Sequence, residues 1–244
     1  MALTKWQIEP AASCWHAVYS AAAGAPLLDA ALGEALRRAA GPEIRAASTP
    51  GSFPTEPPAG RAEAYAAAEE ALTQRASIAE QLSLRTGPLR EQWEARGPGL
   101  MKQLGRLTEP ASGAGPVSVL PVLPVCGGHG LCLTDSRAVT IEAVLANPHA
   151  ELPEVARLGW LVARVDAPRH AAAAAATAVA AIAAAEAVEL ATLDEPTLAL
   201  AIEAWRIESP VAQPDRLAEW WRRYRESPTP WPVAVPMLQE MASR

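Results

Sequence analysis

The sequence lacks the cysteine content and the leader that mark an exported, disulfide-bonded protein. Its 244 residues include only three cysteines, which are too few for a disulfide framework. The first residues, MALTKWQIEP, have neither the apolar core nor the small-residue cleavage site of a secretory signal. We therefore expect a reducing, cytoplasmic setting.

Runs of basic residues and long apolar runs are also missing. Binding along a phosphate backbone needs clustered Lys and Arg, whereas the chain carries a net charge of -6 without any such run. The least polar stretch, residues 171–185, is mostly alanine and falls short of the roughly 20 strongly apolar residues that a spanning helix needs. We expect neither a nucleic-acid partner nor membrane insertion.

Aromatic and β-branched residues are scarce beside alanine, since one Phe and three Tyr accompany eight Trp. Half of the residues are apolar, which is enough for a sizeable core, and the balance favours helix. We predict a predominantly α-helical α+β protein, with a small, mainly antiparallel sheet at about residues 117–146 flanked by helices. Apolar residues at helical spacing predict the main helices at 9–24, 26–41, 61–85, 152–165, from 170 onward, and 215–226. The capping box TLDE at 192–195 predicts one more helix, which reaches Trp205.

Proline and glycine divide the chain. Residues 41–60 hold five prolines and predict a loop or linker between an N-terminal helical pair at 1–40 and a main α+β body at 61–244, which could form a single domain with that pair. The motif TGP at 86–88 predicts the end of one helix, and RGPG at 96–99 predicts a break in the next.

The predicted sheet has two features with consequences. In AVTIEAVL, residues 138–145, apolar positions alternate with Thr140 and Glu142, which predicts a strand with one solvated face. The apolar run that comes before this strand contains Pro121 and Pro124, which cannot donate ladder hydrogen bonds. We therefore expect that run to be an edge strand or an extended segment.

The segment CGGHGLC holds the strongest candidate for a chemical site. If a hairpin turns between Cys126 and Cys132, both thiols lie on one face with His129 in the loop. Cys14 and His16 could then complete a zinc site, because structural zinc takes four Cys or His ligands. The alternatives are a disulfide or redox pair, a phosphate nest of glycine amides, and a plain glycine turn with core cysteines and an exposed histidine.

The order of elements after residue 138 resembles the zincin metallopeptidases, in which an edge strand precedes the helix that bears HExxH. In GWLVARV, Trp160 and Arg164 stand at the spacing of that family's two histidines. Trp cannot bind zinc and no glutamate lies between them, so the resemblance implies an inactive metallopeptidase-like fold.

The C-terminal segment WWRRYRE suggests a partner surface. Trp220, Trp221 and Tyr224 could form an aromatic platform beside Arg222, or they could pack in the core between helices. No polar set has both the identity and the spacing of a known reaction, so we expect a non-catalytic scaffold or protein-interaction protein of unknown oligomeric state that needs no cofactor. The competing hypothesis is a metal-binding protein or enzyme built on the Cys/His set, with zinc as its metal.

Overall fold

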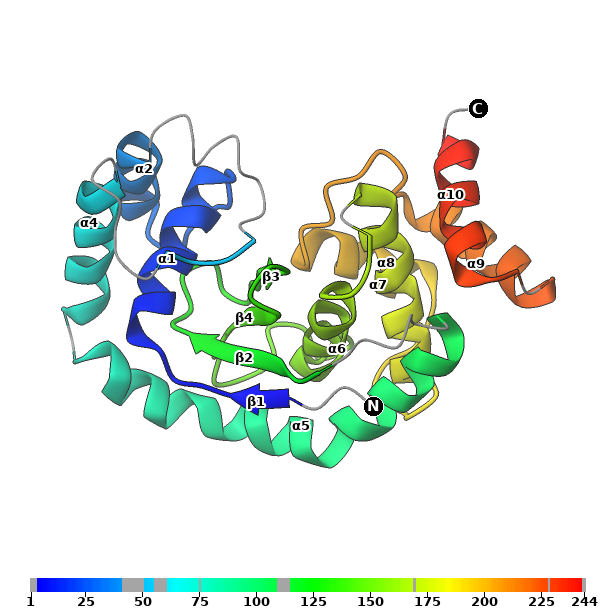
Figure 1. Cartoon of the computed structure of the whole chain (residues 1–244), viewed down its shortest axis with the longest axis horizontal. Helices are drawn as coiled ribbons and strands as arrows, with labels where there is room; N and C mark the ends of the chain where they lie inside the picture. Colours follow the sequence, from blue (N-terminus) through cyan, green and yellow to red (C-terminus); the bar gives the residue numbers. More distant parts are fainter. Residues whose placement is uncertain are drawn as a thin grey trace. The chain divides into compact units, whose positions relative to one another are not determined.

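The computed structural model describes residues 4–40, 51–54, 61–74, 76–108, 115–168, 170–227 and 229–242. These residues form two compact units (Figure 1). One unit contains Glu91–Gly115 and His149–Arg244, and the other contains Leu3–Arg90 and Pro116–Pro148. The predicted α-rich α+β class is confirmed, because helices predominate around one small sheet. Most of the predicted 41–60 linker lies outside the described residues.

The sheet belongs to the second unit and is mixed, so the prediction of a mainly antiparallel sheet was wrong. Its strands lie in the order β1-β2-β4-β3. β1 pairs with β2 and β2 with β4 in parallel, and only β3 is antiparallel to its neighbour β4. Parallel pairing of β1 and β2 is possible because helices fill the long connection between them. The strands are β1 Thr4–Trp6, β2 Val117–Val122, β3 Cys132–Leu133 and β4 Ala138–Glu142.

The predicted hairpin between Cys126 and Cys132 is not present. Cys132 pairs with Val139 in a hairpin of β3 and β4, whereas Cys126 lies in the loop that follows β2. The tight turn is therefore at residues 134–137, where Arg137 has a positive φ of 48°.

β2 is an inner strand, so the expectation of an edge strand was also wrong. The two prolines are tolerated because β1 pairs only with Val117–Val119. Ser118 donates its N–H to Arg137 on the β4 side, and Val119 accepts from Gln7 on the β1 side. By this alternation the nitrogen of Pro121 points to the β1 side, beyond the last residue of β1, where no ladder bond is lost.

β4 has no solvated face. All five of its residues are buried, including Thr140 and Glu142, which have no exposed surface. The prediction of one wet face was wrong because the polar side chains meet α1, Pro10–Ala22, instead of water. α1 begins with proline in its first turn, where the missing N–H costs nothing.

Three helices, α1, α2 and α4, pack together beside the sheet in this unit (Figure 1). α2, Ala30–Ala39, starts at Asp29, whose carboxylate accepts the N–H of Leu32 at 2.9 Å. α4 spans Ala62–Thr73. Their shared core includes Trp15, Leu36 and Leu82.

The helix α5, Ile78–Thr108, runs through both proline motifs. The predicted stop at 86–88 and break at 96–99 were wrong. Each of the two prolines inside α5 costs about 3 kcal/mol. However, α5 buries a stripe of large apolar side chains spaced seven and four residues apart, and their burial stabilises the helix by more than both prolines cost. The stripe consists of Leu82, Leu89, Trp93, Leu100 and Leu104.

The first unit is helical in the part that the structure describes. α6 buries nine of its residues, from Glu154 to Val162. None of the described helices is both long enough and apolar enough to cross a membrane. The helices of this unit, besides the end of α5, are α6 Glu154–Arg164, α7 Ala171–Glu186, α8 Glu195–Ala204, α9 Pro214–Glu226 and α10 Trp231–Ala242.

Candidate functional site

A buried polar stripe on α1 forms one side of the candidate site. Ser13, His16 and Ser20 recur at intervals of three and four residues, so they lie on one face of the helix. None of the three has exposed surface. The Ser13 hydroxyl accepts the N–H of Leu123 at 3.2 Å, which fastens the start of the loop after β2 to the helix.

Glu142, the last residue of β4, forms the base of the site. Its Oε1 accepts the backbone N–H of Val125 at 3.0 Å and of Cys126 at 2.7 Å, and its Oε2 accepts that of Gly128 at 2.5 Å. Gly127 and Gly128 have φ values of 80° and 123°, which L side chains rarely adopt, and these angles turn the amides inward. The anion that these loop amides hold is thus the protein's own carboxylate, and not the phosphate considered from the sequence.

The carboxylate of Glu142 is ionised. Burial by itself would raise its pKa, but the hydrogen bond and charge of His16, with the amides of Gly128 and Cys126, outweigh burial and lower the pKa to about 2. The negative charge is therefore retained inside the unit at neutral pH.

His16 connects Glu142 to Thr140. Its Nε2 lies 3.3 Å from Oε1 of Glu142, and because a carboxylate only accepts, Nε2 carries the proton. Its Nδ1 lies 3.0 Å from the Thr140 hydroxyl, which itself accepts the N–H of Leu131 at 2.9 Å. In the neutral imidazole, Thr140 donates to Nδ1. One end of the loop, at Val125, is thus bonded to Glu142, and the other end, at Leu131, is bonded to Thr140. His16 connects these two side chains.

Ser20 brings a second histidine into the cluster. Its hydroxyl lies 3.2 Å from Nδ1 of His129 and 3.5 Å from Nε2 of His16, and the two imidazole centroids are 5.4 Å apart. A serine–histidine–carboxylate triad needs the serine and the acid on opposite ring nitrogens. Here Ser20 and Glu142 share Nε2 of His16, so these three residues do not form such a triad.

The proposed zinc ligands are only partly brought together. His16 and His129 are neighbours, but the described residues contain no group of three or more His, Cys, Asp or Glu that could hold a metal ion. The Cys14 thiol makes a hydrogen bond with Tyr65 on α4. Burial raises the pKa of this thiol to about 11, and the hydrogen bond offsets part of the increase. Cys132 is buried in β3, Cys126 is half-buried, and none of the three cysteines forms a disulfide.

The cluster lies at the carboxyl ends of the parallel strands. α1 follows β1, the loop 123–131 follows β2, and Glu142 ends β4. This edge is where open parallel sheets usually place ligand sites, because the loops that follow the strands converge there. Among the clustered side chains of His16, Ser20, His129, Thr140 and Glu142, only His129 has exposed surface, and 8% of it is exposed. The adjoining loop residues 126–128 are half-buried.

The proposed aromatic platform is largely internal. Trp220 and Trp221 are 3% and 7% exposed, and the Tyr224 hydroxyl donates to the Leu107 carbonyl at 2.7 Å. Arg222 is exposed, but it pairs with Glu219 and Glu226 on its own helix at 2.6 and 2.7 Å. The rings therefore join α9 to its neighbours within the unit.

Sequence reasoning missed Thr140, Glu142 and Ser20. The strand pattern assigned the first two to solvent, although their partners lie on α1. A signal was present in α1, where Ser13, His16 and Ser20 form a polar stripe in an otherwise apolar helix. A polar stripe on a buried helix requires a polar partner.

Comparison with family models, curated proteins and solved structures finds no match for this chain. The resemblance to zincins therefore stays a hypothesis. The strand on which this resemblance rests is β4, in the second unit, and the helix that contains GWLVARV is α6, in the first unit.

Proposed function

We propose that this chain is a non-catalytic cytoplasmic protein-interaction protein, and that it presents the loop 126–128 together with Leu28 to its partner. The observation that carries the proposal is the buried, ionised Glu142 beneath the loop. Its carboxylate accepts hydrogen bonds from three loop amides and from His16, and the side chain has no exposed surface. A charge placed in this way fixes a loop conformation and cannot reach a substrate.

Energetic cost supports this interpretation. Burying an ionised carboxylate generally stabilises a fold less than apolar packing of the same volume would. Holding a surface loop in a single conformation lowers the entropy that a partner must remove on binding. The buried carboxylate is therefore better explained by presentation of the loop than by stability of the unit.

Leu28 supplies the apolar part of the surface. It is 71% exposed, yet its N–H donates to the Val125 carbonyl at 2.7 Å, which holds it beside the loop. A Cβ added at Gly127 would lie 3.4 Å from a methyl group of Leu28. An exposed leucine beside a rigid, half-buried glycine loop offers a partner both apolar area and backbone hydrogen-bonding groups.

The experiment is site-specific photo-crosslinking of the full chain. A photo-reactive residue at position 28 should capture a protein that the same residue at Leu84, 80% exposed on α5, does not. Binding of that protein to the purified chain should weaken with Leu28→Asp and stay unchanged with Leu84→Asp. Capture of the same proteins at both positions, or of none at position 28, would contradict the proposal.

A metal-dependent or catalytic role is the second candidate. It is favoured by the two histidines that face Ser20 at the carboxyl edge of the strands. Stoichiometric zinc or iron in the purified protein, lost in Cys126→Ser, would support this candidate and count against a purely non-catalytic role. Metal content that Cys126→Ser leaves unchanged would remove the Cys/His version of it.

A further inference from the structure

The helix α10 of the first unit is apolar on both of its faces. Toward the unit it buries Trp231, Ala234, Val235 and Leu238. On the other face Val233 and Met237 are 51% and 49% exposed, and Pro232 and Pro236 are exposed as well. The first two turns of this exposed side are apolar, and polar residues appear only at Gln239 and Glu240. An apolar helix surface of this kind is typical of an interaction site. We therefore expect this exposed side to be covered.

The exposed side of α10 is rigidly held. The Trp220 indole N–H donates to the carbonyl of Ala234 at 3.0 Å, and Trp231 packs edge-on against Trp220 and Tyr224, with centroids 5.8 and 5.6 Å away. These contacts fix α10 to α9 from beneath. Val233 and Met237 consequently form a preformed surface, which reduces the entropy lost on binding.

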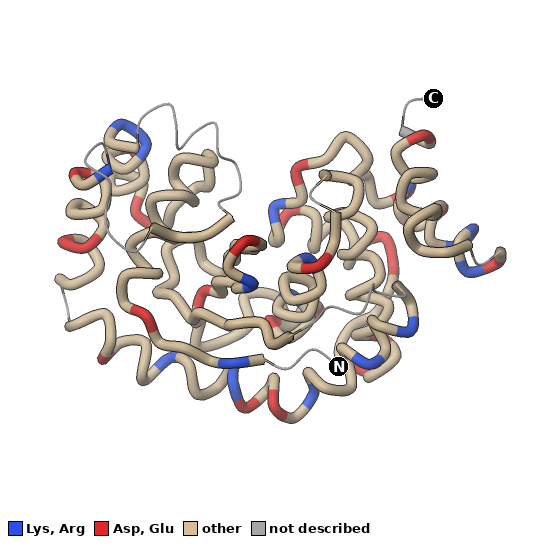
Figure 2. Tube along the Cα trace, in the orientation of Figure 1, with Lys and Arg blue, Asp and Glu red and all other residues tan. Residues whose placement is uncertain are grey.

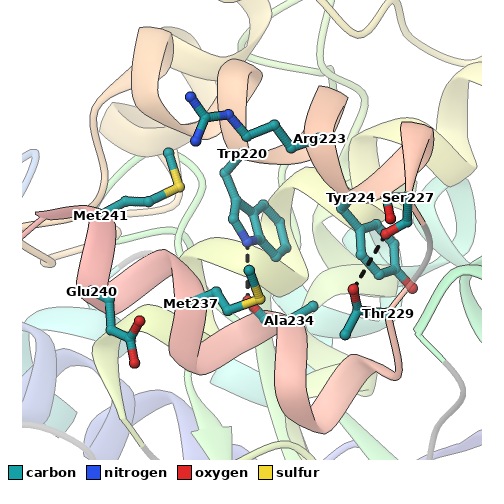
Figure 3. Close-up of a pocket in the computed structure, with 9 residues that line it drawn as sticks. All are labelled: Trp220, Arg223, Tyr224, Ser227, Thr229, Ala234, Met237, Glu240 and Met241. Atoms are coloured by element: carbon teal, nitrogen blue, oxygen red, sulfur yellow. Dashed lines mark hydrogen bonds between the residues drawn. The ribbon is translucent and has the colours of Figure 1, made fainter.

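A groove between α9 and α10 continues this surface. It has a volume of about 290 Å³, and its lining includes Trp220, Tyr224, Met237 and Met241 (Figure 3). Arg223 and Glu240 also line it and lie on opposite sides of Trp220 and Met237 (Figure 3). The groove therefore has an apolar floor with Glu240 on one side. On the other side lies Arg223, whose Nε also donates to Glu219 of α9 at 2.6 Å.

The charges of this region suit self-association. α10 carries no Lys or Arg and one acid near its C-terminal end (Figure 2). Together α9 and α10 hold four arginines and four carboxylates, so the pair is neutral, although the whole chain carries -6. Two copies that meet at a neutral surface avoid most of their mutual repulsion.

We propose that a second copy of this chain covers the α10 surface through a two-fold interface. In a two-fold interface the same patch serves both copies, so a groove with opposite charges on its two sides is self-complementary. Met237 of each copy enters the groove of the other, and Arg223 meets Glu240 of the second copy. Methionine suits such a contact because its flexible thioether adapts to irregular apolar surfaces.

The test is the self-association of the full chain, measured by sedimentation velocity over a range of concentrations. The wild-type chain should form a dimer, and Met237→Glu should raise the dimer dissociation constant roughly tenfold or more, since it buries an unpaired charge. Leu84→Glu is the matched control, because it adds the same charge at an exposed leucine outside α9 and α10. A wild-type monomer at every concentration, or equal effects of the two substitutions, would overturn the proposal.

A charge exchange tests the arrangement itself. Arg223→Glu and Glu240→Arg should each weaken the dimer, and the double variant should recover most of the loss, because the attraction between copies is restored. Arg223→Glu also removes the pair with Glu219 on α9, so circular dichroism must first show equal helix content in the Arg223→Glu single variant and in the double variant. A double variant as weak as the worse single variant would exclude this two-fold contact. These results are independent of crosslinking at Leu28, so failure of one proposal leaves the other standing.

Discussion

Glu142 Oε1 lies 3.3 Å from His16 Nε2, and neither side chain has any exposed surface. The two residues are 126 positions apart in the chain. Their contact joins the carboxyl end of β4 to α1 and places a negative charge directly below the glycine loop. Four predictions test the role of this contact and of the loop that it holds.

Replacing the carboxylate should destabilise the second unit. In Glu142→Gln an amide group replaces one of the oxygens that accept from Val125, Cys126 and Gly128, so a donor faces a donor inside the protein. We expect the free energy of unfolding in urea to fall by roughly 3 to 5 kcal/mol. Glu63→Gln, at an exposed position of α4, should change it by less than about 0.5 kcal/mol. Similar losses in both variants would contradict the assigned role of Glu142.

Stability should depend on acid pH through the same group. The pKa of Glu142 falls from its ordinary 4.5 to about 2 on folding, so its contribution is complete above about pH 5 and is lost as the pH falls from 4.5 toward 2. The free energy of unfolding should decrease by about 3 kcal/mol over that interval through this group. Urea titrations of Glu142→Gln should lack this component. Parallel pH curves for the variant and the wild-type chain would show that Glu142 is not its source.

The two loop glycines should be intolerant of side chains. Gly127→Ala and Gly128→Ala place a Cβ on backbone with φ of 80° and 123°, so each should cost on the order of 1 to 3 kcal/mol of unfolding free energy. Gly105→Ala is the control, because it lies within α5, does not precede a proline, and a Cβ there meets nothing within 4 Å. That substitution should stabilise by roughly 0.5 to 1 kcal/mol. Thermal unfolding of the three variants gives the comparison, and equal effects would remove the argument for strain.

Thiol reactivity should separate the three cysteines. Cys126 is half-buried, whereas Cys14 and Cys132 are buried and burial raises the pKa of Cys14 to about 11. A chromogenic disulfide reagent at neutral pH should therefore modify one thiol in the folded chain and all three after unfolding. Cys126→Ser should abolish the fast reaction. Fast reaction of more than one thiol in the native protein would contradict the assigned burial.

Local sequence was sufficient for elements whose ends carry strong signals. α1 was predicted at 9–24 and runs from Pro10 to Ala22, because Pro10 and Gly24 bound an apolar helical pattern. α5 was predicted to stop twice, since Gly-Pro motifs locally oppose a helix. Whether a helix crosses such motifs depends on how much apolar surface it buries, and that depends on the rest of the unit.

The site could be predicted only in fragments. The glycine-rich turn, His129 and His16 were all candidates, and the two histidines do meet. The expected cysteine ligands did not join them, because the presumed hairpin at 126–132 gave way to pairing of Cys132 with Val139. Thr140 and Glu142 look the same in the sequence whether they face water or His16. Alternation along a strand reveals that two faces differ, but not what covers each face.

The sequence by itself determined the helical character of the chain, the polar stripe on α1 and the glycines that permit an inward-facing loop. These follow from residue propensities, from 3.6-residue periodicity and from the backbone freedom of glycine. Only the tertiary structure decided that β2 and β4 are parallel and that Glu142 is the anion held by the loop. The physical reason is that the donors to this carboxylate come from α1 and from the loop after β2, far from it in sequence. A buried charge is stable only where the fold brings such donors together.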